Sequence, residues 1–147
     1  MSYNYTLEIN TELDRFVVLR ILFPTVINYR ERPGKKYIDL VVGKMPVVIA
    51  EITDEEDVLS AGLGIFPNID VSFSLKGTVG SEIEVLEATL RWLKQREEDM
   101  VLLANYSGVV LMRKNGELIR NGREEFWTPE MLSLITLPHK VEIIPEL

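Results

Sequence analysis

Hydrophobic and polar residues alternate along several stretches of the chain. The alternation covers residues 3–9, where Tyr3, Tyr5, Leu7 and Ile9 would share one face, and it returns over residues 69–75. A period of two is typical of a strand with one buried face. Further apolar runs bounded by turn residues predict strands over 26–30, 37–42, 47–52, 100–104, 109–113, 117–120 and 139–144.

Two longer segments instead repeat their apolar residues at helical spacing. The first begins at a cap formed by Asn10 or Thr11 and runs to about Leu22. The second follows a capping box at residues 81–84 and runs to about Glu98. Its predicted buried stripe consists of Ile83, Leu86, Leu90 and Leu93.

Turn residues divide these elements. Asn115-Gly116 predicts a tight hairpin between the strands on either side of it. Residues 43–46 predict a second hairpin, and residues 32–35 predict a turn. Thr53-Asp54-Glu55-Glu56 reads as another capping box and opens a short helix that stops at Gly62, while Thr128-Pro129-Glu130 opens a last short helix.

Many short strands with two long helices predict an α+β fold, a mainly antiparallel sheet with both helices packed on one face. No linker or low-complexity segment divides the chain, so residues 1–147 are expected to form a single domain. The predicted core consists of Leu7, Ile9, Phe16, Val41, Ile49, Val71, Phe73, Leu86, Leu90, Leu93, Leu102 and Val110.

Composition narrows the classes of function. The chain has no cysteine, which excludes disulfides, thiolate metal ligands and a cysteine nucleophile. Its net charge of −7 disfavours binding to nucleic acid or to an anionic membrane surface. No apolar run is long enough to span a bilayer, and the first residues lack the pattern of a signal peptide. We therefore expect a cytoplasmic protein.

Catalytic and metal-binding patterns are missing from the sequence. His139 is the only histidine, and a zinc site or a general base needs partners that the sequence does not place beside it. The glycines at 62–64 and 77–80 lack the residues of a phosphate-binding loop. The sequence thus predicts a protein without cofactor that is not an enzyme, although Lys, Tyr and carboxylate side chains remain alternative catalytic groups.

Two features are candidate partner-binding sites. The acidic run Glu51, Asp54, Glu55, Glu56 and Asp57 could meet a basic partner or bind a divalent cation, but carboxylates are also typical of the first turn of a helix. Phe126-Trp127 could be an exposed anchor or a core plug, and burial of at least one ring is favoured. A basic strip of Arg113, Lys114, Arg120 and Arg123 reads as a solvated edge rather than a nucleic-acid site.

The order of these segments resembles a known family. The segments that carry the resemblance are the strand at 70–75, Trp92-Leu93, the strand 99–105, the hairpin at 108–118, Phe126-Trp127 and the opening strand Tyr3-Asn4-Tyr5-Thr6-Leu7. They resemble the Sit-type immunity proteins of bacterial contact-dependent toxin exchange systems, in the subgroup without zinc-binding cysteines. The resemblance implies a cytoplasmic protein that binds and neutralises one toxin, with no active site to carry over.

Two functional hypotheses follow. The first is an immunity-type protein that neutralises a toxin by protein–protein contact, with Asp54, Glu55, Asp57, Phe126 and Trp127 as candidate contact residues. Because the run is acidic, the toxin is expected to be basic. The alternative is a structural or adaptor protein that acts through homo-oligomerisation.

Overall fold

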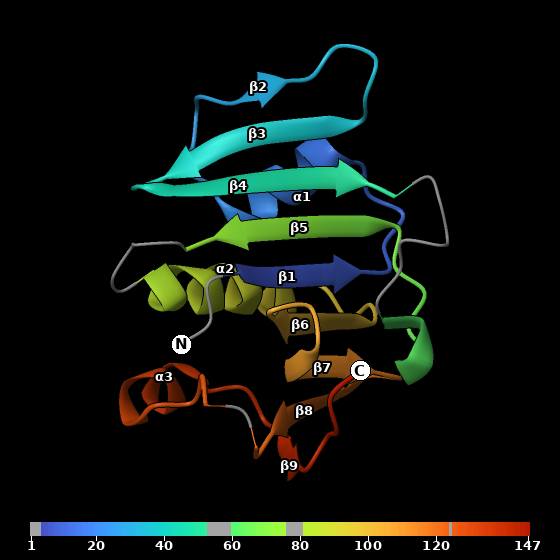
Figure 1. Cartoon of the computed structure of the whole chain (residues 1–147), viewed down its shortest axis with the longest axis vertical. Helices are drawn as coiled ribbons and strands as arrows, with labels where there is room; N and C mark the ends of the chain where they lie inside the picture. Colours follow the sequence, from blue (N-terminus) through green and yellow to red (C-terminus); the bar gives the residue numbers. More distant parts are fainter. Residues whose placement is uncertain (1–3, 53–59, 76–80, 124) are drawn as a thin grey trace.

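The computed structural model describes residues 4–52, 60–75, 81–123 and 125–147. Within these residues nine strands form one sheet (Figure 1). The strands are β1 (Asn4–Ile9), β2 (Arg30–Glu31), β3 (Tyr37–Val42), β4 (Met45–Glu51), β5 (Ile69–Ser74), β6 (Met100–Ala104), β7 (Gly108–Lys114), β8 (Glu117–Asn121) and β9 (Lys140–Glu142). Their order across the sheet is β2-β3-β4-β5-β1-β6-β7-β8-β9. Only β8 and β9 pair in parallel, so the predicted mainly antiparallel sheet is confirmed.

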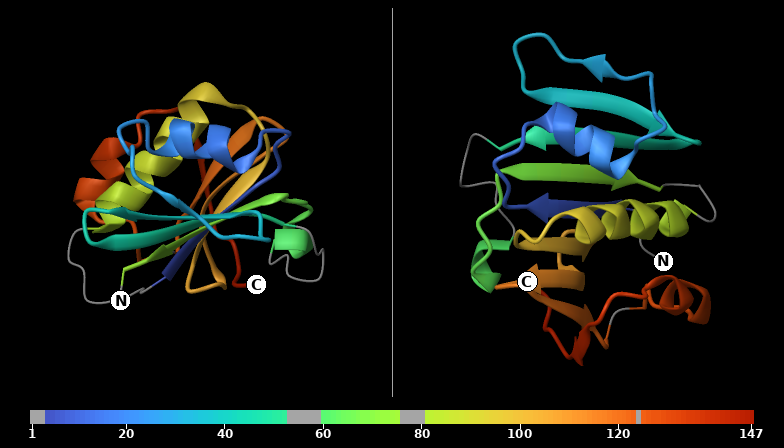
Figure 2. Two further views of the ribbon diagram at one scale, coloured as in Figure 1. Left: turned by 90° about the horizontal axis from the view of Figure 1, so that it is seen from above. Right: turned by 180° about the vertical axis from the view of Figure 1, so that it is seen from behind.

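The two longest helices of the described chain are α1 (Arg15–Leu22) and α2 (Ser81–Gln95), followed by α3 (Pro129–Leu134). Figure 2 shows α1 and α2 on the same side of the sheet, where they pack against each other. The predicted packing of both helices on one face is therefore confirmed. A 3-10 helix, η2 (Ser60–Leu63), stands where the sequence predicts the end of a short helix, whose capping box lies outside the described residues.

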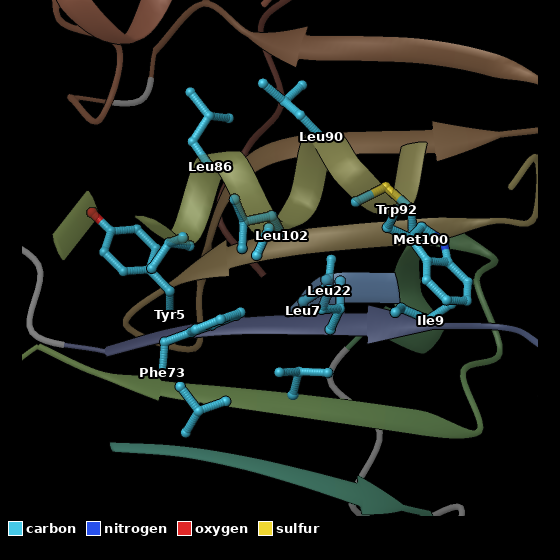
Figure 3. Close-up of a cluster of buried hydrophobic side chains, with 14 of the residues drawn as sticks. Tyr5, Leu7, Ile9, Leu22, Phe73, Leu86, Leu90, Trp92, Met100 and Leu102 are labelled. Carbon is cyan, nitrogen blue, oxygen red and sulfur yellow. The ribbon is translucent and has the colours of Figure 1, made fainter. Parts of the chain in front are cut away.

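The main core lies between the sheet and the helices (Figure 3). Strand β1 contributes Tyr5, Leu7 and Ile9, and α2 contributes Leu86, Leu90 and Trp92. Of the predicted core, two residues differ: Phe16 is only half-buried, and Val41 is 60% exposed. Val41 was wrongly placed because Ile38 and Leu40 face the helices, which turns the odd-numbered residues of β3 to the other face. The other ten are buried.

A smaller apolar cluster covers the opposite face of the sheet. It consists of Ile65, Val101, Leu103, Val109, Met112 and Ile119, with Leu63 of η2 and Ile144 packed against it. All five residues of β6 are consequently buried, which explains why that strand is a continuous apolar run rather than an alternating one.

Helix α1 begins later than the sequence predicts. Its N-cap is Asp14, whose carboxylate accepts hydrogen bonds from the backbone N–H groups of Phe16 and Val17, both at 3.0 Å. Thr11 does not cap the helix: its hydroxyl accepts from the backbone N–H of Leu13, which precedes the helix, at 3.2 Å and donates to Glu98 at 2.6 Å. With this start, the helix buries Val18, Leu19 and Leu22, whereas Val17 is exposed.

Turns and shorter elements follow local sequence more closely. Asn115 and Gly116 have φ values of 53° and 80°, the left-handed pair that a two-residue hairpin requires. The hairpin between β3 and β4 and the Thr128 cap of α3 are also as predicted. The strand predicted at 26–30 is reduced to β2, the one predicted at 139–144 to β9, and α2 ends at Gln95 instead of Glu98.

Candidate functional site

The aromatic corner Phe126-Trp127 belongs largely to the interior. The Phe126 side chain is 5% exposed and meets the Tyr5 ring edge-on, with 5.2 Å between ring centroids. Trp127 is half-buried, and its indole N–H donates to the backbone carbonyl of Val110 at 3.1 Å. The predicted burial of at least one ring is confirmed. Only the exposed part of Trp127 is available to a partner without local opening.

The acidic candidate contact is the run of carboxylates at residues 54–57. Asp54, Glu55, Glu56 and Asp57 lie outside the described residues. The described chain stops just before them at Ile52, whose N–H donates to the carbonyl of Asn68 at 2.9 Å. Their role as a contact for a basic partner stays a prediction.

The predicted basic strip near the β7–β8 hairpin is mostly held by the protein itself. The Arg113 guanidinium donates to the backbone carbonyls of Leu93 and Arg96, at 3.1 and 2.5 Å. Lys114 donates to the carbonyl of Leu63 at 2.7 Å, and the Arg120 guanidinium lies 5.5 Å from the centroid of the Trp127 ring. These cations stabilise loops and a helix end, and Arg123 alone has a fully exposed position.

Two carboxylates that the sequence analysis did not single out lie face to face on the sheet. Glu8 in β1 and Asp70 in β5 are directly opposite each other, on the face away from α1 and α2. Glu8 is fully buried and accepts a hydrogen bond from the Ser60 backbone N–H at 3.0 Å. Burial, and then the negative charge of Glu8, raise the pKa of Asp70 to about 6, while the hydrogen bond from Ser72 opposes the rise. Asp70 can therefore take up a proton near neutral pH.

The Glu8–Asp70 pair lacks the third side-chain ligand that would be expected of a metal site in the described structure. Across the described residues, no group of three or more His, Asp or Glu side chains is placed to hold a metal ion. His139, the one histidine, is half-buried in the loop before β9. Its Nδ1 lies within hydrogen-bond distance of the backbone carbonyl oxygen of Leu137, at 2.9 Å.

A hollow of about 500 Å³ lies beside the end of β8. It is lined by Gly108, Asn121, Arg123, Ile144 and Glu146. The Asn121 amide is already occupied: it donates to the carbonyls of Val109 and Ile144 and accepts from the N–H groups of Arg123 and Ile144. The Asn121 side chain therefore anchors the C-terminal segment at this hollow and is not free to bind a ligand.

The β2 edge of the sheet carries exposed side chains that the sequence analysis passed over. In the loop before β2, Ile27 is 85% exposed and Tyr29 is 45% exposed. The Tyr29 ring lies 6.1 Å from the ring of Phe16 in α1, and Arg15 stacks over Phe16 at 4.5 Å from its centroid. Arg15 also pairs with Glu51 at 2.5 Å. Ile27 and Tyr29 both fall within the strand that the sequence predicts over residues 26–30, but nothing in that short segment indicates that their side chains are exposed.

Together these features define a class: an α+β protein on one mainly antiparallel sheet, with helices on one face and exposed side chains at an edge strand. The model of a family described as SitI3-like matches residues 3–131. The chain belongs to this family, whose name suggests an immunity protein of the Sit type. Searches of curated proteins and of solved structures find no match. No helix in the described parts of the chain is long and apolar enough to cross a membrane.

Proposed function

We propose that the protein is a cytoplasmic immunity-type protein that binds a bacterial toxin and neutralises it by protein–protein contact, without catalysis. The observation that carries this proposal is the SitI3-like family match over residues 3–131. The chain has no cysteine, which supports its assignment to the subgroup without zinc-binding cysteines. The Glu8–Asp70 pair does not change the proposal, because both carboxylates accept hydrogen bonds within the protein. Glu8 accepts from the Ser60 N–H in η2, and Asp70 accepts from the Ser72 hydroxyl in β5.

The test is rescue of growth by co-expression with the toxin encoded by a neighbouring gene. The wild-type protein is expected to restore growth in cells that express this toxin. A Leu7→Asp variant, which places a carboxylate in a fully buried position of β1, should not restore it because it should not fold. Failure of a well-folded wild-type protein to rescue growth would overturn the proposal.

The acidic residues Asp54, Glu55 and Asp57 are our candidate contact for a basic toxin. Reversing all three to Lys should slow association and flatten its dependence on salt, with little change in Tm, because opposite charges steer encounter more than they add affinity. Glu56 is left unchanged because it is part of the predicted capping box. Stopped-flow or surface plasmon resonance measurements from 50 to 500 mM salt would follow the change.

A matched control reverses the same number of carboxylates elsewhere. Glu12, Glu87 and Glu146 are exposed and can each be changed to Lys. If the variant reversed at 54, 55 and 57 associates at the same rate as this control, then Asp54, Glu55 and Asp57 are not the contact.

The alternative is a structural or adaptor protein that acts through homo-oligomerisation. Its support is exposed apolar surface at the β9 edge, where Val141 is 53% and Ile143 is 62% exposed. Sedimentation equilibrium of the purified protein distinguishes the two. A stable oligomer that a Val141→Ser/Ile143→Ser variant dissociates, together with no growth rescue, would favour the adaptor.

A further inference from the structure

Positive charge is concentrated in one part of this acidic chain. Residues 15–50 carry seven Lys and Arg side chains against two Asp and Glu, whereas the rest of the chain carries nine against 21. The segment therefore has a net positive charge, and the remainder is strongly negative. A separation of charge on this scale produces a field that steers a partner of complementary charge.

The fold places this segment at one end of the sheet. Residues 15–50 form α1, β2, β3 and most of β4, and β2 is the outermost strand (Figure 1). Strand β2 pairs with β3 alone, so its other side has no strand beside it in the described sheet. An open edge offers backbone N–H and C=O groups to an added strand.

Some of the positive side chains are neutralised within the protein. Arg15 pairs with Glu51 and, at 3.7 Å, with Glu31, while Arg32 pairs with Asp39 at 2.7 Å. Five exposed cations of this segment make no ion pair to any described residue: Arg20, Arg30, Lys35, Lys36 and Lys44. Lys44 lies in the hairpin between β3 and β4, and we call the other four the basic edge. Arg20 is in α1, Arg30 in β2, and the two lysines in the turn that leads to β3.

Exposed apolar groups lie beside these charges. Ile27 and Tyr29 lie in the loop that leads into β2, and the Tyr29 ring lies 6.1 Å from the ring of Phe16 in α1. Arg and Tyr are the residues that most often dominate the energy of protein interfaces, particularly where an apolar group can be buried with them. The mixture of charge, aromatic and aliphatic groups is that of a protein-binding surface.

We infer that the basic edge, with Ile27 and Tyr29, binds an acidic surface of the toxin. This inference rests on the proposed function and adds a second contact of opposite sign to the acidic residues 54–57. A protein partner is favoured over nucleic acid because the exposed aliphatic side chain of Ile27 lies in the same loop as Tyr29, and a protein surface can bury both. A second copy of the chain is disfavoured, because a two-fold contact would bring the same positive edges together.

The test measures association with the toxin of the neighbouring gene for two doubly substituted proteins of equal net charge. The edge variant is Arg30→Gln/Lys36→Gln, and the control is Lys94→Gln/Arg123→Gln, whose side chains are exposed elsewhere. The edge variant should associate about five- to tenfold more slowly at 50 mM salt, and the difference should shrink at 500 mM. The control should stay within about twofold of wild type.

An uncharged pair of substitutions tests the apolar part of the surface. Ile27→Ser should raise Kd by about tenfold, since it removes a group that would be buried in the complex, whereas Ile143→Ser at the opposite edge should not. Both side chains are exposed in the free protein, so Tm should change little in either variant.

The outcomes separate this inference from the proposed function. Growth rescue and tight binding with no effect of the edge variant would overturn the inference and leave the function standing. No binding by the wild-type protein would overturn both. Binding of a fluorescent single-stranded DNA that the edge variant abolishes, or self-association that it abolishes, would also overturn the inference by assigning the edge to another occupant.

Discussion

Asp70 lies on the face of the sheet away from α1 and α2, and its environment there changes its acidity. Its carboxyl has a pKa of about 6 in the folded protein against an ordinary value of 3.8. The folded state therefore holds this proton more tightly than the unfolded chain does. The stabilisation from this group is complete below about pH 4, and it is lost as pH rises through 6.

An Asp70→Asn variant should remove this loss. It keeps an oxygen that can accept the Ser72 hydroxyl but carries no charge to face Glu8. We expect the variant to be more stable than wild type at pH 8, by on the order of 2 kcal/mol, and nearly equal to it at pH 4. Urea unfolding at a series of pH values would measure the difference.

The control for this experiment is Glu142→Gln, which removes an exposed carboxylate in β9. Its stability should follow the wild-type pH profile. An Asp70→Asn protein with that same profile would show that Asp70 does not hold a proton more tightly after folding.

Asn121 shows how one amide fixes the position of a whole strand. Strand β9 is short and fully exposed, and it pairs in parallel with β8 at the edge of the sheet. The Asn121 side chain makes four hydrogen bonds, to the backbones of Val109, Arg123 and Ile144. Two of them go to Ile144, which follows β9 in the chain. The stability of the C-terminal segment should depend on that amide.

An Asn121→Ala variant should free the C-terminal segment and destabilise the protein. Because the side chain is 3% exposed, its loss leaves buried carbonyl and N–H groups without partners, at a cost of about 2–3 kcal/mol. Hydrogen exchange should become faster in residues 140–144, and β1 should keep its protection. Asn28→Ala, in the exposed loop before β2, serves as a comparison that should leave residues 140–144 unchanged.

Local signals in the sequence identified most elements, and distant contacts account for the differences. The Asn115-Gly116 hairpin follows from two residues with left-handed backbone, so its position could be predicted. The start of α1 could not, because Thr11 bonds to Glu98 and Asn68, which are 87 and 57 positions away. Val41 was placed in the core because an apolar strand residue does not reveal which face its neighbours bury.

Of the candidate surfaces, too, one could be predicted from local sequence and the other depends on the arrangement of the strands. Burial of Phe126 was predictable from an aromatic pair before a capped helix. The basic edge was visible in the sequence only as an excess of positive charge over residues 15–50. Only the strand order, with β2 outermost, brings those charges to an edge that a partner can reach.

At the scale of the whole molecule, the described residues present exposed positive side chains at the β2 edge, and none of their His, Asp or Glu side chains form a group placed to hold a metal ion. Such a protein would act by remaining bound, with one copy consumed for each toxin molecule. Complementary charge would set the rate of encounter, and apolar groups such as Ile27 would set the lifetime of the complex.

Titration of the toxin's activity tests this account most directly. Purified toxin, held well above the Kd of the complex, would be mixed with increasing amounts of the protein, and the remaining activity measured at once and after an hour. Neutralisation by contact predicts a linear fall to zero at a fixed equivalence of about one to one, with no change over time. Loss of activity at far less than one equivalent, increasing with time, would show that the protein acts as a catalyst and would contradict the account.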